Sequence, residues 1–313
     1  MQTIHCGGGE SAGPSVVTIG KFDGVHVGHQ ALLRATREEA AERGTRAGVL
    51  TFDRHPTEVL RPDAAPPYLT PLPEKLRLLE AEGMDFCVVL RLADGVLTWT
   101  ADEFVQRALV DCAGARAVVT GPDFQYGRGR QGTLETLRAA GADRGFTIRT
   151  LAPVVVAGAT VSSYAVRQAL SAGDLPLAGA MLGRAYSVRG RVVSGRRLGR
   201  TLGFPTANLA FDIPTALPSH GIYAVTAAWD GETRPAVASL GVRPTVETGP
   251  APVLLEVHLL DWSGDLYGKT LTVTFVHRLR DEERFDGLDA LTAQIQRDAD
   301  EARRLLSQSA AHM

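Results

Sequence analysis

The pattern of apolar segments changes near residue 186, and this change constrains the fold more than any other feature of the sequence. Before that point, short runs rich in Val, Ile and Leu alternate with segments whose apolar residues recur at helical spacing. After it, the runs are rich in Val, Thr and Tyr, and turn dipeptides such as Ser-Gly, Asp-Gly and Gly-Pro separate them. Two patterns in one chain predict two domains of different class.

The alternation in the first half predicts an α/β domain with a doubly wound parallel sheet, whose ligands bind at the carboxyl ends of the strands. The predicted strands cover residues 15–19, 47–52, 86–90, 117–119 and 147–156. The predicted helices cover residues 29–43, 73–82, 101–109, 134–140 and 166–172.

The second half predicts a small antiparallel β-barrel. Its predicted strands cover residues 186–193, 222–229, 234–240, 253–260 and 270–276. The apolar residues of 288–306 recur at near-helical spacing, so an amphipathic C-terminal helix should pack on the barrel. The chain has 313 residues, which suits two domains. We place the boundary between 1–180 and 181–313, where Gly173, Asp174 and Pro176 interrupt the helical pattern.

The charge balance argues against a nucleic-acid partner, because 33 basic and 35 acidic side chains produce no broad positive field. Cys6, Cys87 and Cys112 are widely spaced and form no CxxC motif, a pattern typical of a reducing compartment. The first residues do not resemble a signal peptide, and no run of about 18 apolar residues occurs. We therefore expect a soluble cytoplasmic protein with no membrane partner. Its oligomeric state is not predicted.

The segment TIGKFDGVHVGHQ follows a predicted strand and opens a helix, so its backbone amides predict a phosphate site. Gly24 and Gly28 allow a ligand to approach closely, and both His26 and His29 can reach it. The imidazoles can stabilise negative charge that develops on an attacked α-phosphate. The alternatives are that the histidines cap the helix or bind a structural metal, although no third ligand stands nearby. GxGxxG and GxxxxGK motifs do not occur in this segment.

The segment GRRLGRTLGFPTANL is the second candidate phosphate site. Glycines such as Gly199 and Gly203, beside arginines such as Arg200, let backbone amides and guanidinium groups approach phosphates. Thr206 and Asn208 follow and offer the oxygen ligands that Mg²⁺ prefers. The alternative is a flexible basic loop without a ligand.

The first half resembles a known family. FDGVHVGHQ is similar to the HxGH signature of the nucleotidyltransferase superfamily, in the form found in bacterial FAD synthetases. TFDRHPTEVL, YLTPLPEKLRLLEAEGMD, GPDFQYGRGRQGT and VSSYAVRQAL resemble successive blocks of the FMN adenylyltransferase module. The resemblance implies that His26 and His29 contact ATP phosphates, that Asp123, Phe124 and Gly127 line the flavin and nucleotide cleft, and that Ser162, Ser163 and Arg167 hold the adenylate end and phosphates.

Three residues depart from the family pattern. Arg54 stands where Pro is usual, Pro122 replaces a larger apolar residue, and Tyr164 replaces a small hydroxyl residue after the serine pair. The added ring at Tyr164 raises the alternative of an inactive or altered adenylyltransferase. For Asp123 and Ser163, capping of a turn is the alternative to ligand binding.

The second half resembles the riboflavin kinase module along nearly its whole length. The matching segments include GRAYSVRGRVVSGRRLGRTLGFPTANL, HGIYAV, SLGVRPTVE, LEVHLLDWSGDLYGK and FVHRLRDEERFDGLDALTAQIQRD. The resemblance implies that Thr206 and Asn208 hold Mg-ATP, that Glu256 is the general base for the ribityl 5′-hydroxyl, and that Arg280, Glu283 and Phe285 form a flap over the flavin. For Glu256, a surface ion pair is the alternative.

Both halves together resemble the bacterial bifunctional riboflavin kinase/FMN adenylyltransferase family. The implied reactions convert riboflavin and ATP to FMN and ADP in the barrel, then FMN and ATP to FAD and pyrophosphate in the α/β domain, with Mg²⁺ as cofactor. The first rival is a riboflavin kinase with an inactive or altered N-terminal domain. The other rivals are a flavin- or nucleotide-binding regulator without turnover and an enzyme that transfers aminoacyl groups to RNA.

Overall fold

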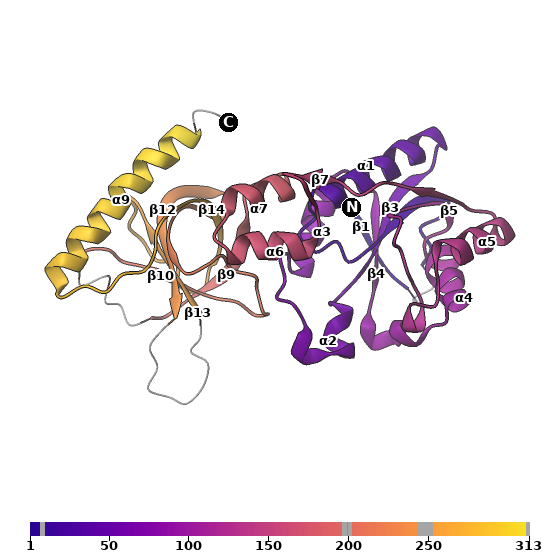
Figure 1. Ribbon diagram of the computed structural model, residues 1–313, viewed down its shortest axis with the longest axis horizontal. Coiled ribbons are helices and arrows are strands. Elements are labelled where there is room, and N and C mark those ends of the chain that lie inside the picture. The colour runs from indigo at the N-terminus through magenta and orange to yellow at the C-terminus, as the bar shows by residue number, and fades with distance from the viewer. Residues whose placement is uncertain (7–9, 196–198, 200–201, 243–252, 311–313) are drawn as a thin grey trace. The chain divides into compact units, whose positions relative to one another are not determined.

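The structure is a computed structural model that describes residues 1–6, 10–195, 199, 202–242 and 253–310 (Figure 1). The chain divides into two compact units, Met1–Ser163 and Tyr164–Met313. Helices α6 (Ser163–Ser171) and α7 (Leu175–Leu182) span the interval between the end of the first unit and the barrel. The domain boundary predicted at residue 180 therefore stays a prediction.

The first unit contains the predicted parallel sheet. Six parallel strands lie in the order β1-β4-β3-β2-β5-β6. They are β1 (Gln2–His5), β2 (Ser15–Ile19), β3 (Arg46–Phe52), β4 (Phe86–Leu90), β5 (Ala115–Thr120) and β6 (Thr147–Thr150). The predicted strand 147–156 is in fact β6 followed by β7 (Val155–Val156), which pairs with β8 (Ala159–Thr160) in a separate two-stranded sheet.

Helices cover both faces of this sheet, because neighbouring residues of each central strand point to opposite faces. Val16 of β2 packs with Leu33 of α1 (Val27–Glu42) and Leu79 of α3 (Leu72–Ala81). Val17 packs on the other face, where Leu137 belongs to α5 (Leu134–Arg144). The remaining helical segments are α2 (Pro56–Leu60), η1 (Pro62–Ala64), η2 (Leu92–Asp94), η3 (Val96–Thr98), α4 (Ala101–Phe104), the π-helical η4 (Val105–Cys112) and η5 (Arg128–Arg130).

The strand order determines where a ligand can bind. From β2 the chain proceeds to β3 on one side, whereas β5 pairs with the other side of β2. A doubly wound sheet binds its ligand at such a switch point, outside the carboxyl ends of the strands. The loop that follows β2 carries Gly24 and His26, and the loop that follows β5 carries Asp123 and Phe124. The topology therefore brings two predicted site segments to the same edge of the sheet.

The cysteines pair in a way that their spacing did not predict. Cys6 and Cys112 form a disulfide across 106 residues, and Cys87 is a buried free thiol. Cys6 follows edge strand β1 and Cys112 ends η4, so the fold brings them together from distant parts of the chain. Cysteine spacing is therefore a weak basis for inferring a reducing compartment in this chain.

The second unit contains the predicted antiparallel barrel. It is closed, with the strand order β10-β13-β12-β11-β14-β9. The strands are β9 (Ser187–Val193), β10 (Ala207–Ala210), β11 (Gly221–Trp229), β12 (Glu232–Val242), β13 (Val253–Leu259) and β14 (Thr270–Arg280). The predicted C-terminal helix is α9 (Leu288–Ala310), which packs against the barrel through Ala299, Ala302 and Leu306 (Figure 1).

The burial pattern of strand β13 indicates which face of the barrel wall a ligand can reach. Leu255, Val257 and Leu259 are buried, whereas the alternating residues Glu256 and His258 are only half-buried. Because alternate side chains of a strand point to opposite faces, Glu256 and His258 lie on the outer face. Polar groups of this face therefore remain accessible to a ligand.

Candidate functional site

The loop after β2 is strained. Phe22 and Val25 adopt positive φ values of 50° and 39°, and Gly24 between them has a φ of 88°. For residues with a side chain, this left-handed conformation costs about 1–3 kcal/mol each and persists only where the surroundings enforce it. Strain of this kind is concentrated at functional sites. The loop geometry thus supports the phosphate site predicted from the sequence.

Asp23 holds this loop in place. Its buried carboxylate accepts hydrogen bonds from the backbone N–H groups of Leu69 (3.1 Å) and Thr70 (2.9 Å). The Thr70 hydroxyl accepts a further hydrogen bond from the Gly24 N–H at 2.9 Å. The Ser163 hydroxyl donates to the Asp23 carbonyl at 2.8 Å. These bonds connect the strained loop to residues 69–70 and to Ser163, which are distant from it in the sequence.

The two histidines form a stacked pair. Their ring centroids are 3.6 Å apart, and His26 Nδ1 accepts a hydrogen bond from the His29 N–H at 3.2 Å. His26 therefore caps α1, as the alternative interpretation proposed, but the cap does not exclude ligand binding. A Cβ atom at Gly28 would lie 3.2 Å from His26 Nδ1, so a side chain there would crowd the pair.

The environment keeps His29 neutral. Burial lowers the pKa of His29 well below its ordinary value, and the positive charges of His26, Lys75 and Lys21 lower it further. Within the described residues, the buried Nδ1 atom of His29 has no hydrogen-bond partner. At pH 7 its imidazole can therefore contact a phosphate by hydrogen bonding and brings no positive charge.

A cavity of about 650 Å³ opens beside this loop, and its lining includes Lys21 together with the predicted residues Asp123, Phe124 and Gly127. The rings of Phe124 and Tyr126 stack with their centroids 5.7 Å apart, which provides a flat aromatic wall. The sequence analysis did not predict the other lining residues, among them Phe52, His55, Phe104, Tyr126 and Arg130. Of these, all but Phe104 stand in the quoted family blocks, which was the only signal available.

Other predicted residues lie elsewhere. His26 follows Lys21 in the loop after β2, and His29 lies in the first turn of α1. Neither histidine lines the cavity. Ser162 directly precedes α6, and Arg167 lies on α6 within the second unit.

The three unusual residues do not block this cavity. Arg54 and Pro122 are exposed and do not belong to its lining. Tyr164 begins the second unit, and 70% of its surface is exposed. The departures that raised the alternative of an altered N-terminal domain therefore leave the described cavity open.

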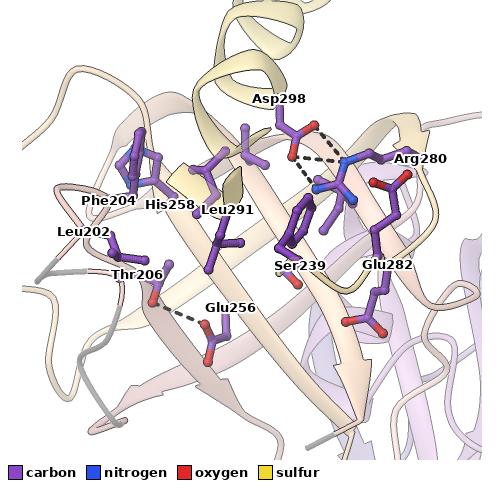
Figure 2. Close-up of a pocket in the computed structure, with 16 residues that line it drawn as sticks. Leu202, Phe204, Thr206, Ser239, Glu256, His258, Arg280, Glu282, Leu291 and Asp298 are labelled. Atoms are coloured by element: carbon purple, nitrogen blue, oxygen red, sulfur yellow. Dashed lines mark hydrogen bonds and ion pairs between the residues drawn. The ribbon is translucent and has the colours of Figure 1, made fainter. Parts of the chain in front are cut away.

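In the second unit, three adjacent strands bring polar residues together. Asn208 of β10 and Ser239 of β12 both pair with Glu256 of β13. Directly paired residues in a sheet share a face, so the three side chains lie side by side. The Thr206 hydroxyl donates to Glu256 Oε2 at 3.5 Å (Figure 2).

Two cavities meet at Thr206. One, of about 270 Å³, includes Glu256, Phe204 and Phe285 in its wall. The other, of about 310 Å³, includes Trp262 and Tyr267. The predicted residues Gly199, Arg280 and Glu283 also line the first cavity. Gly203 has a φ of 85° and lines neither cavity, and Arg200 lies outside the described residues.

A buried ion pair forms one wall of the first cavity. Arg280 donates from Nε and Nη2 to Asp298 of α9, at 2.9 and 2.7 Å, and its guanidinium lies 5.8 Å from the centroid of the Phe285 ring (Figure 2). Its bond to Asp298 raises the pKa of Arg280. Ser239 and Asp298 line the cavity but were not predicted, although both stand in segments quoted for the resemblance to the riboflavin kinase module.

His258 is a further missed residue. Its Nδ1 atom lies 2.8 Å from the carbonyl oxygen of Pro205, and its ring makes an edge contact with Phe204. The carbonyl can only accept, so the hydrogen bond requires a proton on Nδ1. His258 therefore helps to hold the turn that positions Thr206. Its spacing of two residues from Glu256 on one strand is a signal that could have identified it.

The donor set of the barrel site fits Mg²⁺. Thr206 and Asn208 offer hydroxyl and amide oxygens beside the Glu256 carboxylate, and a hard cation prefers oxygen ligands. In the described part of the chain, no group of three or more His, Cys, Asp or Glu residues is arranged to hold a metal. A cation here would therefore complete its coordination with phosphate oxygens and water.

The fold and the sites define an HxGH-type nucleotidyltransferase unit joined to a kinase-type barrel. The family profile of FAD synthetase matches residues 9–165, and that of riboflavin kinase matches residues 182–306. A bifunctional riboflavin kinase/FMN adenylyltransferase from Pseudomonas fluorescens is 43% identical over 94% of each chain. The corresponding Escherichia coli K12 protein is 43% identical over 90% of each chain. This chain belongs to the bifunctional riboflavin kinase/FMN adenylyltransferase family.

A solved structure agrees on the fold. It comes from Streptococcus pneumoniae, is described as a macrolide-efflux protein, and matches with a TM-score of 0.87 at 31% identity, over 97% of this chain and 99% of its own. Among the residues that our structure describes, no helix combines the length and apolar character needed to cross a membrane.

Proposed function

We propose that the barrel phosphorylates riboflavin with Mg-ATP and that the α/β unit transfers an adenylyl group from ATP to the resulting FMN. The observation that carries the kinase assignment is the Thr206–Glu256 contact, which lies where two cavities meet. A phosphoryl transfer needs two ligands placed end to end, and Thr206 borders both spaces.

The position of Glu256 indicates which ligand occupies each cavity. It lines the cavity beneath α9 and does not line the one beside Trp262. A general base must be near the hydroxyl that it deprotonates, so riboflavin occupies the Glu256 cavity. The aromatic rings of Phe204 and Phe285 suit a flat isoalloxazine. ATP then occupies the other cavity, where Trp262 and Tyr267 offer faces for the adenine.

The kinase step follows from this placement. The Glu256 carboxylate accepts the proton of the ribityl 5′-hydroxyl as that oxygen attacks the γ-phosphorus, and ADP leaves. Thr206 and Asn208 orient the phosphate end of ATP on the opposite side of the reacting centre. Mg²⁺, when bound, neutralises charge on the phosphate oxygens. Positioning and charge neutralisation account for most of the catalysis in such transfers.

The adenylyl step uses the first unit. The FMN phosphate attacks the α-phosphorus of ATP, a new P–O–P linkage forms, and pyrophosphate leaves. The cavity of about 650 Å³ is large enough for a flavin, and Phe124 and Tyr126 provide the stacking wall. Lys21 and Arg130 line the same cavity and attract phosphate groups. The neutral His29 and the N-terminus of α1 contact phosphates by hydrogen bonds.

We also propose the substrates, the cofactor, the partners and the location of the enzyme. The substrates are riboflavin, FMN and ATP, with Mg²⁺ required for both reactions and no nucleic-acid partner. The protein acts in the cytoplasm, where ATP is available.

One experiment tests both activities. Purified protein receives riboflavin, ATP and Mg²⁺, and chromatography follows FMN and FAD over time. Glu256→Gln should stop FMN formation from riboflavin while leaving FAD formation from supplied FMN unchanged. His29→Ala should produce the reverse pattern. A wild-type protein that accumulates FMN without FAD would support the rival of a kinase with an inactive first unit. Loss of both activities in each variant would contradict the assignment of separate sites.

A further inference from the structure

Lys75 is an unusual residue, because its ammonium group is buried behind the adenylyl-transfer site. It lies on α3, with only 6% of the residue exposed. Its ammonium donates three hydrogen bonds, to the carbonyl oxygens of Lys21 (3.1 Å) and Phe52 (3.0 Å) and to the Thr51 hydroxyl (3.1 Å). All three partners are neutral oxygens. A buried charge without a carboxylate partner is costly, and such groups are concentrated at functional sites.

The partners of Lys75 stand at the carboxyl ends of two adjacent strands. Lys21 follows β2, and Phe52 ends β3. Both residues line the cavity assigned to FMN, whereas Lys75 does not. The Thr51 hydroxyl also donates to the Lys21 carbonyl at 3.1 Å, so two donors hold this one oxygen. The three bonds therefore join the ends of β2 and β3 from a residue that lies outside the cavity lining.

This anchoring also orients the strained loop. The chain contains no cis peptide among its described residues, so the C=O of Lys21 and the N–H of Phe22 point in opposite directions. Because the carbonyl is turned toward Lys75, the N–H of Phe22 is turned away from it. Phe22 is also the first of the two residues with a side chain that the loop holds at positive φ. Lys75 is thus bonded to the peptide at which the strained conformation begins.

We infer that Lys75 is a positioning residue for adenylyl transfer, which fixes the loop after β2 against the end of β3 and places a positive charge beneath the phosphate-binding loop. The inference rests on the proposed function, because it assigns the phosphate groups to this loop. Lys75 acts through Lys21, Phe52 and His29 and does not touch the substrate itself.

The charges around Lys75 permit a pH test. Burial lowers the pKa of Lys75 to about 8, against the opposing negative charges of Asp23 before α1 and Asp53 after β3. Cys87 is itself buried, which raises its pKa to about 12, so it stays a neutral thiol near pH 8. Lys75 therefore loses its proton as the pH rises through about 8. The positive charge that we infer to be required is lost in the same range.

The experiment compares Lys75→Met, Lys75→Arg and Thr51→Val in the full chain. Lys75→Met keeps the length of the side chain and removes the charge. The kcat for FAD formation should therefore fall about 10- to 100-fold, the usual loss when a residue that orients active-site groups is removed. The dissociation constant of FMN, measured by fluorescence quenching, should change less than about threefold, and riboflavin kinase activity should be unchanged. Thr51→Val removes hydrogen bonds from the same network but keeps the ammonium, and should retain most of the activity.

The pH profile separates positioning by charge from simple structural support. The kcat of the wild type for FAD formation should decline above about pH 8. Lys75→Arg keeps its charge at that pH, so the kcat of this variant should not decline above about pH 8. Its activity at pH 7 should exceed that of Lys75→Met. Equal losses in Lys75→Met, Lys75→Arg and Thr51→Val, with the decline unchanged, would overturn the inference.

Two further outcomes are decisive. If Lys75→Met fails to fold, which circular dichroism and loss of FMN binding would show, the pH profile of Lys75→Arg decides the question alone. If wild-type protein forms no FAD, the proposed function fails. If wild type forms FAD and Lys75→Met forms it equally fast, only the inference about Lys75 fails.

Discussion

The ion pair between Arg280 and Asp298 provides the most quantitative prediction. Only 17% of the Arg280 side chain and 6% of the Asp298 side chain are exposed. Asp298→Ala removes the acceptor of the Arg280 bonds and of a 2.9 Å bond from the Gln294 amide. The guanidinium then remains largely buried, with the charges of Glu283 and Glu282 nearby but without its hydrogen-bonded carboxylate. Breaking one partner of a buried pair costs about 3–5 kcal/mol of unfolding free energy.

The remaining contacts of Arg280 set the value within this range. Its Nη1 atom also donates to the Asp281 carbonyl at 2.9 Å, and its partial exposure lets water reach the charge. We therefore expect a cost near the lower end, about 3 kcal/mol. For a unit of roughly 150 residues, this corresponds to a decrease in Tm of about 6–12 °C.

A matched control lies two residues further along the same helix. Asp300 pairs with Arg303, but their side chains are 62% and 38% exposed. Exposed ion pairs contribute about 0–1 kcal/mol, so Asp300→Ala should cost less than about 1 kcal/mol. The two substitutions are chemically identical. They differ in the burial of the pair that they break, and Arg303 also keeps an ion pair with Asp261.

The assay is guanidinium denaturation followed by tryptophan fluorescence. A Trp99→Phe background removes the tryptophan of the first unit, so Trp229 and Trp262 report on the barrel. The double variant Arg280→Met/Asp298→Leu should regain much of the stability lost in Asp298→Ala, because it leaves no unpaired buried charge. If Asp298→Ala and Asp300→Ala cost the same, the reasoning from burial is refuted.

Three other predictions follow from local contacts. A Cβ at Gly48 would lie 2.1 Å from the Phe86 ring, so Gly48→Ala should cost about 1–3 kcal/mol, and Phe86→Leu should restore part of it; full stability of Gly48→Ala alone would contradict this. Because the pKa of His29 is lowered, the unfolded state binds more protons below pH 6.5, so the first unit should lose stability as the pH falls through that value, and His29→Gln should reduce the loss. Because Cys6 and Cys112 are paired, thiol titration of the denatured protein should count one thiol without reductant and three with it; three in both cases would exclude the disulfide.

The long regular segments of the fold could be predicted because their own residues determine them. Every residue of β2 is buried, and its run of β-branched side chains fits a central parallel strand. Strand β1 was missed because Ile4 is its only buried residue, which leaves no pattern to detect. Helix α7 was missed because Asp174 and Pro176 were interpreted as a linker. In the structure they are start signals, since the Asp174 side chain caps the helix at the Leu177 N–H.

Apart from the residues that the family resemblance supplied, such as Glu256 and Arg280, the candidate sites could be predicted only where their residues are neighbours in the sequence. Thr206 and Asn208 stand in one short segment, and His26 and His29 in another. Asp298 could not be assigned to a site, because only the packing of α9 on the barrel brings it to Arg280. The same holds for the disulfide, whose cysteines are 106 residues apart. Without a family resemblance, a single sequence does not show which residues converge from distant elements.

The structure changes the role assigned to the histidine pair. The sequence suggested that imidazoles stabilise the charge that develops on the attacked phosphate, but burial and nearby cations keep His29 neutral at pH 7. Lys21 and Lys75 are among those cations, and their positive charge both attracts phosphates and prevents protonation of His29. The positive charges that act on this loop are thus those of His26, Lys75 and Lys21, while the neutral His29 can offer a ligand only a hydrogen bond.

This division of roles distinguishes two substitutions of His29. His29→Asn keeps a neutral donor and should form FAD faster than His29→Phe, which has no donor. Neither variant should remove the decline in activity above about pH 8, because that decline belongs to Lys75. If His29→Asn is as defective as His29→Phe, and FAD formation by the wild type instead follows protonation of an imidazole near pH 6.5, the charged form of His29 is the reacting one and the lysines do not supply the positive charge.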